Sequence, residues 1–168
     1  MPITFEIENI VTDLQNAIRS QLTDDTWFSG IDVFTPDDMS AEGTNKTPSD
    51  IEQRINQSLG SLKGVCMIVV LPVFGSVASD SPGIFSDNVP VLVRIIENPL
   101  INRGANGTQK TASMIATRVM RRLQHFTYRE CVIVIKTAKR IADDNSLIWD
   151  VSAQTSLNLP ALEITQTP

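Results

Sequence analysis

Apolar residues near the N-terminus recur at intervals of three and four positions: Ile7, Ile10, Val11, Leu14, Ala17, Ile18 and Leu22. This spacing places them along one face of an α-helix, which we expect to end before Asp24-Asp25. The next segment, residues 26–46, contains Pro36, two glycines and many polar residues. Its composition indicates irregular structure, with at most a short strand at residues 31–34.

A second helix is predicted at residues 47–60 from its start signals. Thr47 can cap the helix, and Pro48 can occupy the first helical position because no N–H is needed there. Asp50 suits the positive end of the helix dipole. One face of this short helix is apolar, formed by Ile51, Ile55 and Leu59.

Two β-branched apolar runs follow, at residues 65–71 and 89–96. The first is nearly continuous, which is typical of a central strand that is covered on both faces. The connection between them, residues 73–88, is long for a hairpin and unusually apolar. We predict that it is an arm that docks on a partner, and the alternative is a loop folded onto its own domain. Its apolar residues are Val73, Phe74, Val77, Ile84 and Phe85.

A third helix is predicted after residue 107, with arginines in its last turns, where cations suit the helix C-terminus. We expect Thr108 to cap it and Lys110 to lie in its first turn. We also expect Gly104 and Gly107 to adopt backbone angles that other residues resist. Its inward residues are Ala112, Ile115, Ala116, Val119, Met120 and Leu123, and its arginines are Arg118, Arg121 and Arg122.

The last two predicted strands, residues 131–138 and 147–155, flank a turn-like Ala142-Asp143-Asp144-Asn145 segment. The final strand alternates apolar and polar residues, which favours a half-buried outer strand. The full order is helix, helix, strand, strand, helix, strand, strand. This ααββαββ order predicts an α+β fold, a mixed four- to five-stranded sheet with helices packed mainly on one face.

The chain length of 168 residues fits one domain. We assign residues 1–156 to a single α+β domain with the arm at 73–88, and residues 157–168 to a C-terminal extension. A right-handed crossover through the third helix would make the second and third strands parallel.

Composition favours a globular protein, because 42% of the residues are hydrophobic and 20% are charged. No apolar run approaches the roughly 18 to 20 residues needed to span a bilayer, and acidic residues stand where a signal peptide needs basic ones. We therefore expect synthesis in the cytoplasm and no membrane partner. Cys66 and Cys131 lie within apolar runs and are expected to be buried free thiols.

The net charge of −5 conceals an uneven distribution. Residues 1–60 hold eleven Asp or Glu against three Lys or Arg, whereas residues 94–140 hold ten Lys or Arg against two Glu. The fold could mix the two regions and cancel their fields. Otherwise the molecule has an acidic and a basic face, which would favour head-to-tail packing of identical subunits or contact with a polyanion.

Candidate chemistry is sparse. The loop RGANGTQKT at residues 103–111 lies where a phosphate-binding loop would, but two residues separate its glycines where a Walker loop needs four. His125 is the one histidine, and Asp37-Asp38 and Asp143-Asp144 carry no metal-ligand pattern. We therefore predict no catalytic, cofactor-binding or metal-binding residues, and expect the protein not to be an enzyme.

One segment resembles a known family. Residues 91–126, VLVRIIENPLINRGANGTQKTASMIATRVMRRLQHF, contain Glu-Asn-Pro after a strand, then an Asn-Arg-Gly-rich loop, a Gly-Thr helix start and an amphipathic helix. This pattern is similar to that of the tail terminator, or tail completion, proteins of long-tailed bacteriophages. The closing segment SLIWDVSAQTSL is similar to the last strand of that family. The matching loop residues are Glu97, Asn98, Pro99, Asn102, Arg103, Gly104, Gly107 and Thr108.

The resemblance implies a non-enzymatic virion protein that forms a homo-oligomeric, usually hexameric, ring. Such a ring caps the tube of the major tail protein, stops its polymerisation and provides the head-joining surface. Its partners would be other copies of itself, the tube protein and a head-completion or neck protein, with DNA only passing through the lumen. The alternatives are a neck or head-completion protein of the head-tail connector and a small ligand-binding module or enzyme.

The expected interface residues combine the asparagine-rich loop, the arm and the basic helix end. Amide groups can both donate and accept, and arginine pairs with carboxylates, so these side chains suit contacts with a neighbouring subunit. They are Asn98, Asn102, Arg103, Asn106, Phe74, Ile84, Phe85, Arg118, Arg121 and Arg122.

Overall fold

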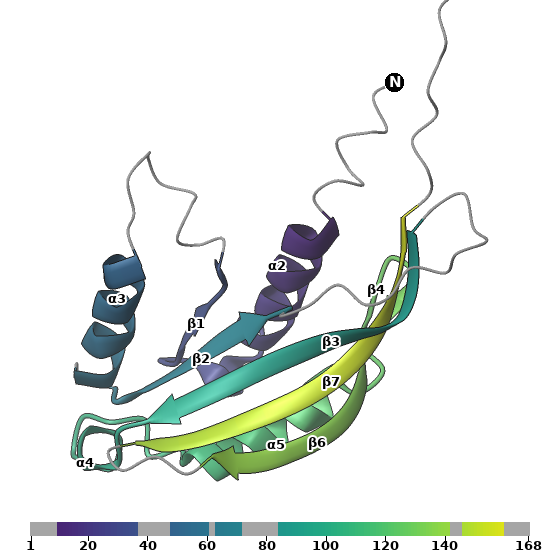
Figure 1. Ribbon diagram of the computed structural model, residues 1–168. Coiled ribbons are helices and arrows are strands. Elements are labelled where there is room, and N and C mark those ends of the chain that lie inside the picture. The colour runs from purple at the N-terminus through teal and green to yellow at the C-terminus, as the bar shows by residue number, and fades with distance from the viewer. Residues whose placement is uncertain (1–9, 37–47, 61–62, 72–83, 142–145, 160–168) are drawn as a thin grey trace, which may run out of the picture.

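The computed structural model describes residues 10–36, 48–60, 63–71, 84–141 and 146–159, giving the backbone alone at 48–52, 84–87 and 158–159. Thr47, Phe74 and the rest of segment 72–83 therefore lie outside the described residues. The fold is α+β, as the sequence predicts (Figure 1). The elements are α2 (Ile10–Thr23), η1 (Thr26–Phe28), β1 (Asp32–Phe34), α3 (Pro48–Gly60), β2 (Val65–Val70), β3 (Ile84–Glu97), α4 (Pro99–Asn102), α5 (Ala112–Leu123), β4 (Thr127–Tyr128), β5 (Cys131–Val132), β6 (Val134–Ile141) and β7 (Leu147–Leu159).

The main sheet has five strands in the order β1-β2-β3-β7-β6. β1 is parallel to β2, and the other three pairs are antiparallel. β3 and β6 run in the same direction, as a crossover through α5 requires, but β7 lies between them. The interior position of β2 is confirmed.

The prediction that the last strand is an outer strand is wrong, because β7 pairs with β3 on one side and β6 on the other. Its alternation has a different cause. Val151, Ala153 and Leu157 point to the face that packs on helices and are buried, whereas Ser152 and Gln154 on the other face are half-buried. An alternating pattern shows only that one face of a strand is covered. In a sheet with helices on one face, a central strand therefore has the same pattern as an outer strand.

α2 and α5 pack on the same face of the sheet and bury the main core. We call the opposite face, on which Arg94 and Asp150 lie, the open face. Helix α3 packs near β2, at the edge where Ser58 donates a hydrogen bond to Asp32 of β1. The core is formed chiefly by Leu14, Ile18, Met67, Val93, Ile95, Ile115, Val119 and Val151.

β3 and β7 are longer than predicted. β3 begins at Ile84, so the backbone of Ile84 and Phe85, which we assigned to the arm, pairs with Leu159 and Asn158 of β7. Leu157 is buried, although the C-terminal extension was expected to start there. The two strands continue together past the ends of β2 and β6, as the upper right of Figure 1 shows.

Candidate functional site

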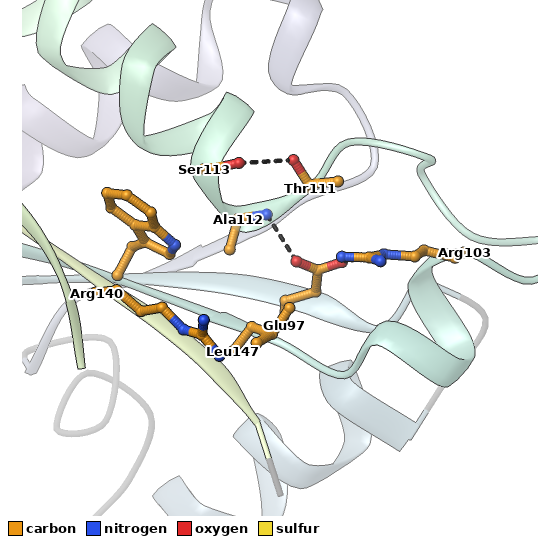
Figure 2. Close-up of a pocket in the computed structure, with 8 residues that line it drawn as sticks. Glu97, Arg103, Thr111, Ala112, Ser113, Arg140 and Leu147 are labelled. Atoms are coloured by element: carbon orange, nitrogen blue, oxygen red, sulfur yellow. Dashed lines mark hydrogen bonds and ion pairs between the residues drawn. The ribbon is translucent and has the colours of Figure 1, made fainter. Parts of the chain in front are cut away.

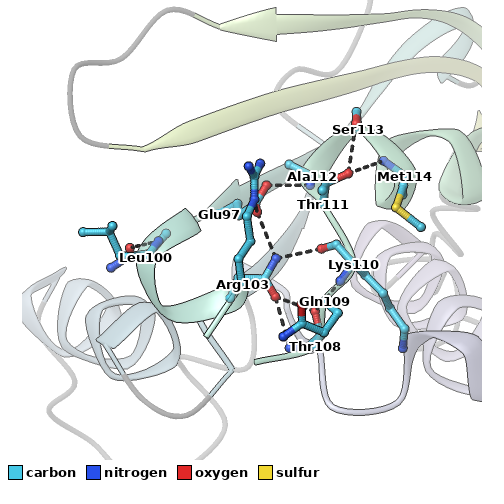
Figure 3. A network of polar contacts seen from close by, with 12 residues as sticks. Glu97, Leu100, Arg103, Thr108, Gln109, Lys110, Thr111, Ala112, Ser113 and Met114 are labelled. Atoms are coloured by element: carbon cyan, nitrogen blue, oxygen red, sulfur yellow. Dashed lines mark hydrogen bonds and ion pairs between the residues drawn. The ribbon is translucent and has the colours of Figure 1, made fainter. Parts of the chain in front are cut away.

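The asparagine-rich loop is organised around Glu97, the last residue of β3, whose side chain is fully buried. One carboxylate oxygen accepts from Asn102 Nδ2 at 3.0 Å and from Arg103 Nε at 3.3 Å. The other accepts from the backbone N–H of Ala112 at 2.7 Å, at the first residue of α5 (Figure 3). We call these four residues the Glu97 cluster. Because a carboxylate stabilises a helix N-terminus, Glu97 takes the position that an external anion would occupy.

Asn102 is also fully buried, and every hydrogen-bonding position of its side chain is used. Its amide nitrogen donates to Glu97 and to the carbonyl oxygen of Lys110, the latter at 2.8 Å. Its carbonyl oxygen accepts from the N–H of Thr108 at 3.2 Å and from the Thr108 hydroxyl at 2.6 Å. One side chain therefore fixes the path of the chain from α4 to α5.

The start of α4 presents an exposed apolar side chain. Asn98 caps this helix by accepting from the N–H of Leu100 at 3.2 Å, and Pro99 occupies its first position. The Asn98 N–H donates to the carbonyl of Gly64 at 2.8 Å, which anchors the loop to the strand before β2. Leu100 is 89% exposed, although the loop that carries it is hydrogen-bonded on both sides.

Three expectations about the start of α5 are wrong. The cap is Thr111, which accepts from the N–H of Met114, while Thr108 bonds to Asn102 and Lys110 precedes the helix. Neither Gly104 nor Gly107 has a positive φ, whereas Gln109 does, at 61°. Gly107 is required for space, since a Cβ there would lie 1.9 Å from the carbonyl oxygen of Asn102.

A pocket of about 200 Å³ opens beside the Glu97 cluster, where the sheet extends past the beginning of α5 (Figure 2). Its floor comes from two cross-strand pairs, Glu97 with Leu147 and Trp149 with Arg140. Its wall is formed by Arg103, by Thr111, which caps α5, and by the first two residues of that helix, Ala112 and Ser113.

The arginines of α5 face elements from the acidic N-terminal third. Nε and Nη2 of Arg118 donate to Asp25 at 2.9 and 3.1 Å, and Arg122 donates to the carbonyl oxygen of Gln21. Hydrogen bonding from the Trp27 N–H and from Arg118 lowers the pKa of Asp25 below its usual range, against the opposing effect of burial. The fold thus cancels part of the charge difference between the two regions.

The two cysteines are free and buried, as predicted. Burial raises the pKa of the Cys66 thiol to about 12, and it also raises the pKa of the Cys131 thiol. Because the thiolate is the reactive form of cysteine, both side chains are held in their inert state. His125 is exposed and has a left-handed backbone, with φ at 61°.

The structure brings together only some of the predicted interface residues. Asn98, Asn102, Arg103 and the exposed Asn106 lie together in the asparagine-rich loop, which contains α4 and is called the α4 loop below. The other predicted arginines form a separate group along α5, where Arg121 is exposed. Phe74 lies outside the described residues, and the side chains of Ile84 and Phe85 are not described.

Sequence reasoning missed Glu97 as the organising residue, together with Leu100, Arg140 and Trp149. A signal for Glu97 was present. Alternation along β3 places Val91, Val93 and Ile95 toward the helices, and the next position of that series is Glu97. A carboxylate at a core position predicts dedicated donors around it.

Within the described residues, no group of three or more His, Cys, Asp or Glu side chains could hold a metal ion. None of the described helices is long and apolar enough to cross a membrane. No known protein-family model matches the chain, and no curated protein matches it significantly.

Proposed function

We propose that the protein is a bacteriophage tail terminator, a non-enzymatic protein whose copies form a ring on the end of the tail tube. The ring would stop tube polymerisation and offer a surface for joining the head. The proposal begins from the resemblance of residues 91–126 to that family, which lies in the segment from β3 to α5.

The observation that carries the proposal is the exposed Leu100 on a tightly held loop. Eight residues carry the resemblance, and five of them fix that loop: Glu97, Asn98, Asn102, Gly107 and Thr108. A loop whose own polar groups are satisfied internally keeps its shape when it meets a partner, which reduces the entropy lost on binding. Such a loop suits assembly.

The remaining exposed groups at this end suit a protein partner. Leu100 offers an apolar contact, while Arg103, with a side chain 52% exposed, and the exposed Asn106 can donate hydrogen bonds. Arginine is enriched at protein interfaces, and an exposed apolar side chain loses contact with water when a partner covers it.

The proposal is tested by adding the purified protein to tail tubes during polymerisation and measuring tube length by electron microscopy. We expect shorter tubes with the protein on one end. Light scattering of the protein alone and with tubes gives the mass of the assembly. A protein that stays monomeric and leaves tube length unchanged would contradict the proposal.

Leu100→Asn should abolish binding of the protein to the end of the tail tube. It should leave the fold unchanged, because the Leu100 side chain is almost entirely exposed to solvent. The matched control is Val132→Asn on β5, a second exposed apolar residue away from the α4 loop. If the Leu100→Asn variant still binds tube ends and stops their growth, the α4 loop is not part of the contact surface.

A further inference from the structure

The pocket beside the Glu97 cluster holds more positive than negative charge. Arg103 and Arg140 line it together with one carboxylate, that of Glu97. Glu97 is fully buried and already accepts three hydrogen bonds, so these donors stabilise its negative charge. Among the described residues, Arg140 has no hydrogen-bond or ion-pair partner, and Arg103 uses only its Nε.

We propose that this pocket binds a carboxylate side chain from a second copy of the chain. This inference rests on the proposed ring and names one of its contacts. Arg103 and Arg140 supply guanidinium donors, and Thr111 and Ser113 also line the pocket. Guanidinium groups pair with carboxylates through two parallel N–H donors, a geometry that fixes orientation as well as charge.

The size and lining of the pocket favour a single protein side chain. About 200 Å³ between the start of a helix and the floor formed by Leu147 and Trp149 suits an Asp or Glu side chain with its apolar stem. Nucleic-acid phosphates lie on a broad surface and are contacted by many basic residues together, so a recessed pocket with an indole in its floor fits them less well.

Charge complementarity favours a second copy of the chain as the source of that carboxylate. Residues 1–60 of the same chain carry eleven Asp or Glu against three Lys or Arg. Within the described residues, Asp25 and Asp13 are paired with arginines, and Asp24 is exposed. A surplus of acid in one region, and guanidinium N–H donors left over in another, suit a head-to-tail contact between identical subunits.

The test is Arg140→Glu, because Arg140 is exposed and, unlike Arg103, gives no hydrogen bond to Glu97. We expect at least about a tenfold loss in the self-association constant, measured by light scattering over a concentration series. Arg140→Lys should lose less, because charge remains but the planar donor pair is gone. Lys136→Glu is the matched control, since it places the same charge change on an exposed residue of β6 that does not line the pocket.

The outcomes separate this inference from the function. If the Arg140→Glu variant self-associates as the unaltered protein does, the proposed contact in the pocket is contradicted, and the proposed ring is not. If Lys136→Glu weakens association equally, general charge and not the pocket is responsible, which also overturns it. Association unaffected by Arg140→Glu with lost binding to duplex DNA would assign the pocket to a polyanion. An unaltered protein that is monomeric both free and on tubes would contradict the function and the inference together.

Discussion

Two carboxylates of the β3–β7 pair accept hydrogen bonds from arginine, and they lie on opposite faces of the sheet. Glu97 is fully buried beside the start of α5. It accepts three hydrogen bonds, from the Asn102 side-chain amide, the Ala112 backbone N–H and Arg103. Asp150 lies on the open face, where Nε and Nη2 of Arg94 both donate to it at 2.8 Å. Glu97 fixes the backbone of a loop, whereas Arg94 and Asp150 join two strands that already pair directly.

The comparison shows that a short ion pair and a structurally important carboxylate are different things. The Arg94–Asp150 pair has the better geometry and Asp150 is buried, yet the Arg94 side chain is 41% exposed, so water competes for its N–H groups. Glu97 has the longer contact to arginine, but removing it would leave buried donors unsatisfied. The donors that depend on a carboxylate decide its contribution more than the length of its ion pair does.

The largest effect is expected at Glu97. Glu97→Ala should lower the free energy of unfolding by about 3 to 5 kcal/mol, because Asn102, Arg103 and the Ala112 N–H lose their acceptor together. Glu97→Gln keeps one acceptor oxygen and should lose about half as much. Urea unfolding followed by circular dichroism measures both variants. The control is Glu130→Ala, an exposed glutamate for which we expect a change within about 0.5 kcal/mol. A loss below about 1 kcal/mol for Glu97→Ala would remove the central role of this residue.

A smaller loss is expected for Gly107→Ala. The added Cβ would meet the carbonyl oxygen of Asn102, a backbone atom that cannot rotate away, so the loop must shift at a cost of about 1 to 3 kcal/mol. Gly60→Ala is the matched control, because no heavy atom outside its local backbone lies within 4 Å of its added Cβ. We expect that control to be neutral or slightly stabilising. Equal thermal shifts in the two variants would contradict a close-packing role for Gly107.

The smallest effect is expected on the open face. Arg94→Ala should lower the free energy of unfolding by about 1 kcal/mol. The buried Asp150 loses its arginine, but the Arg94 side chain is exposed, and Lys139 lies directly opposite Asp150 on β6 and can replace it. The loss should shrink further in 1 M salt, which screens exposed pairs. If Arg94→Ala destabilised the protein as much as Glu97→Ala, the contrast between the two faces would be lost.

The fold class followed from periodicity because each helix and strand buries one regular face. α2, α3 and α5 lie where their apolar spacing predicts, within the described residues, although α5 begins at Ala112 and not at the predicted Thr108 cap. Strand neighbours were harder to predict, because the alternation of β7 reflects cover on one face and not its place in the sheet. Pairing depends on contacts between residues far apart in sequence.

The sequence predicted where the candidate site lies, in the asparagine-rich loop, better than it predicted the roles of the residues there. The asparagine-rich loop was expected to contact a partner through its amides, yet the Asn102 amide is used internally, beside the carboxylate of Glu97. Thr108 and Thr111 carry equivalent local signals for a helix cap. Asn102 decides between them by binding the Thr108 hydroxyl, a tertiary contact that no local pattern contains.

The central place of β7 bears on the order in which the protein matures during synthesis. β3 and β6 both use β7 as a neighbour, and β7 is made after them. Until the ribosome has added the residues beyond Ile141, the 14-residue β3 has only the six-residue β2 beside it, and β6 has no neighbour in this sheet. Translation must therefore reach the last strand before the sheet can be completed, and until then β3 and β6 each have an edge without its final partner.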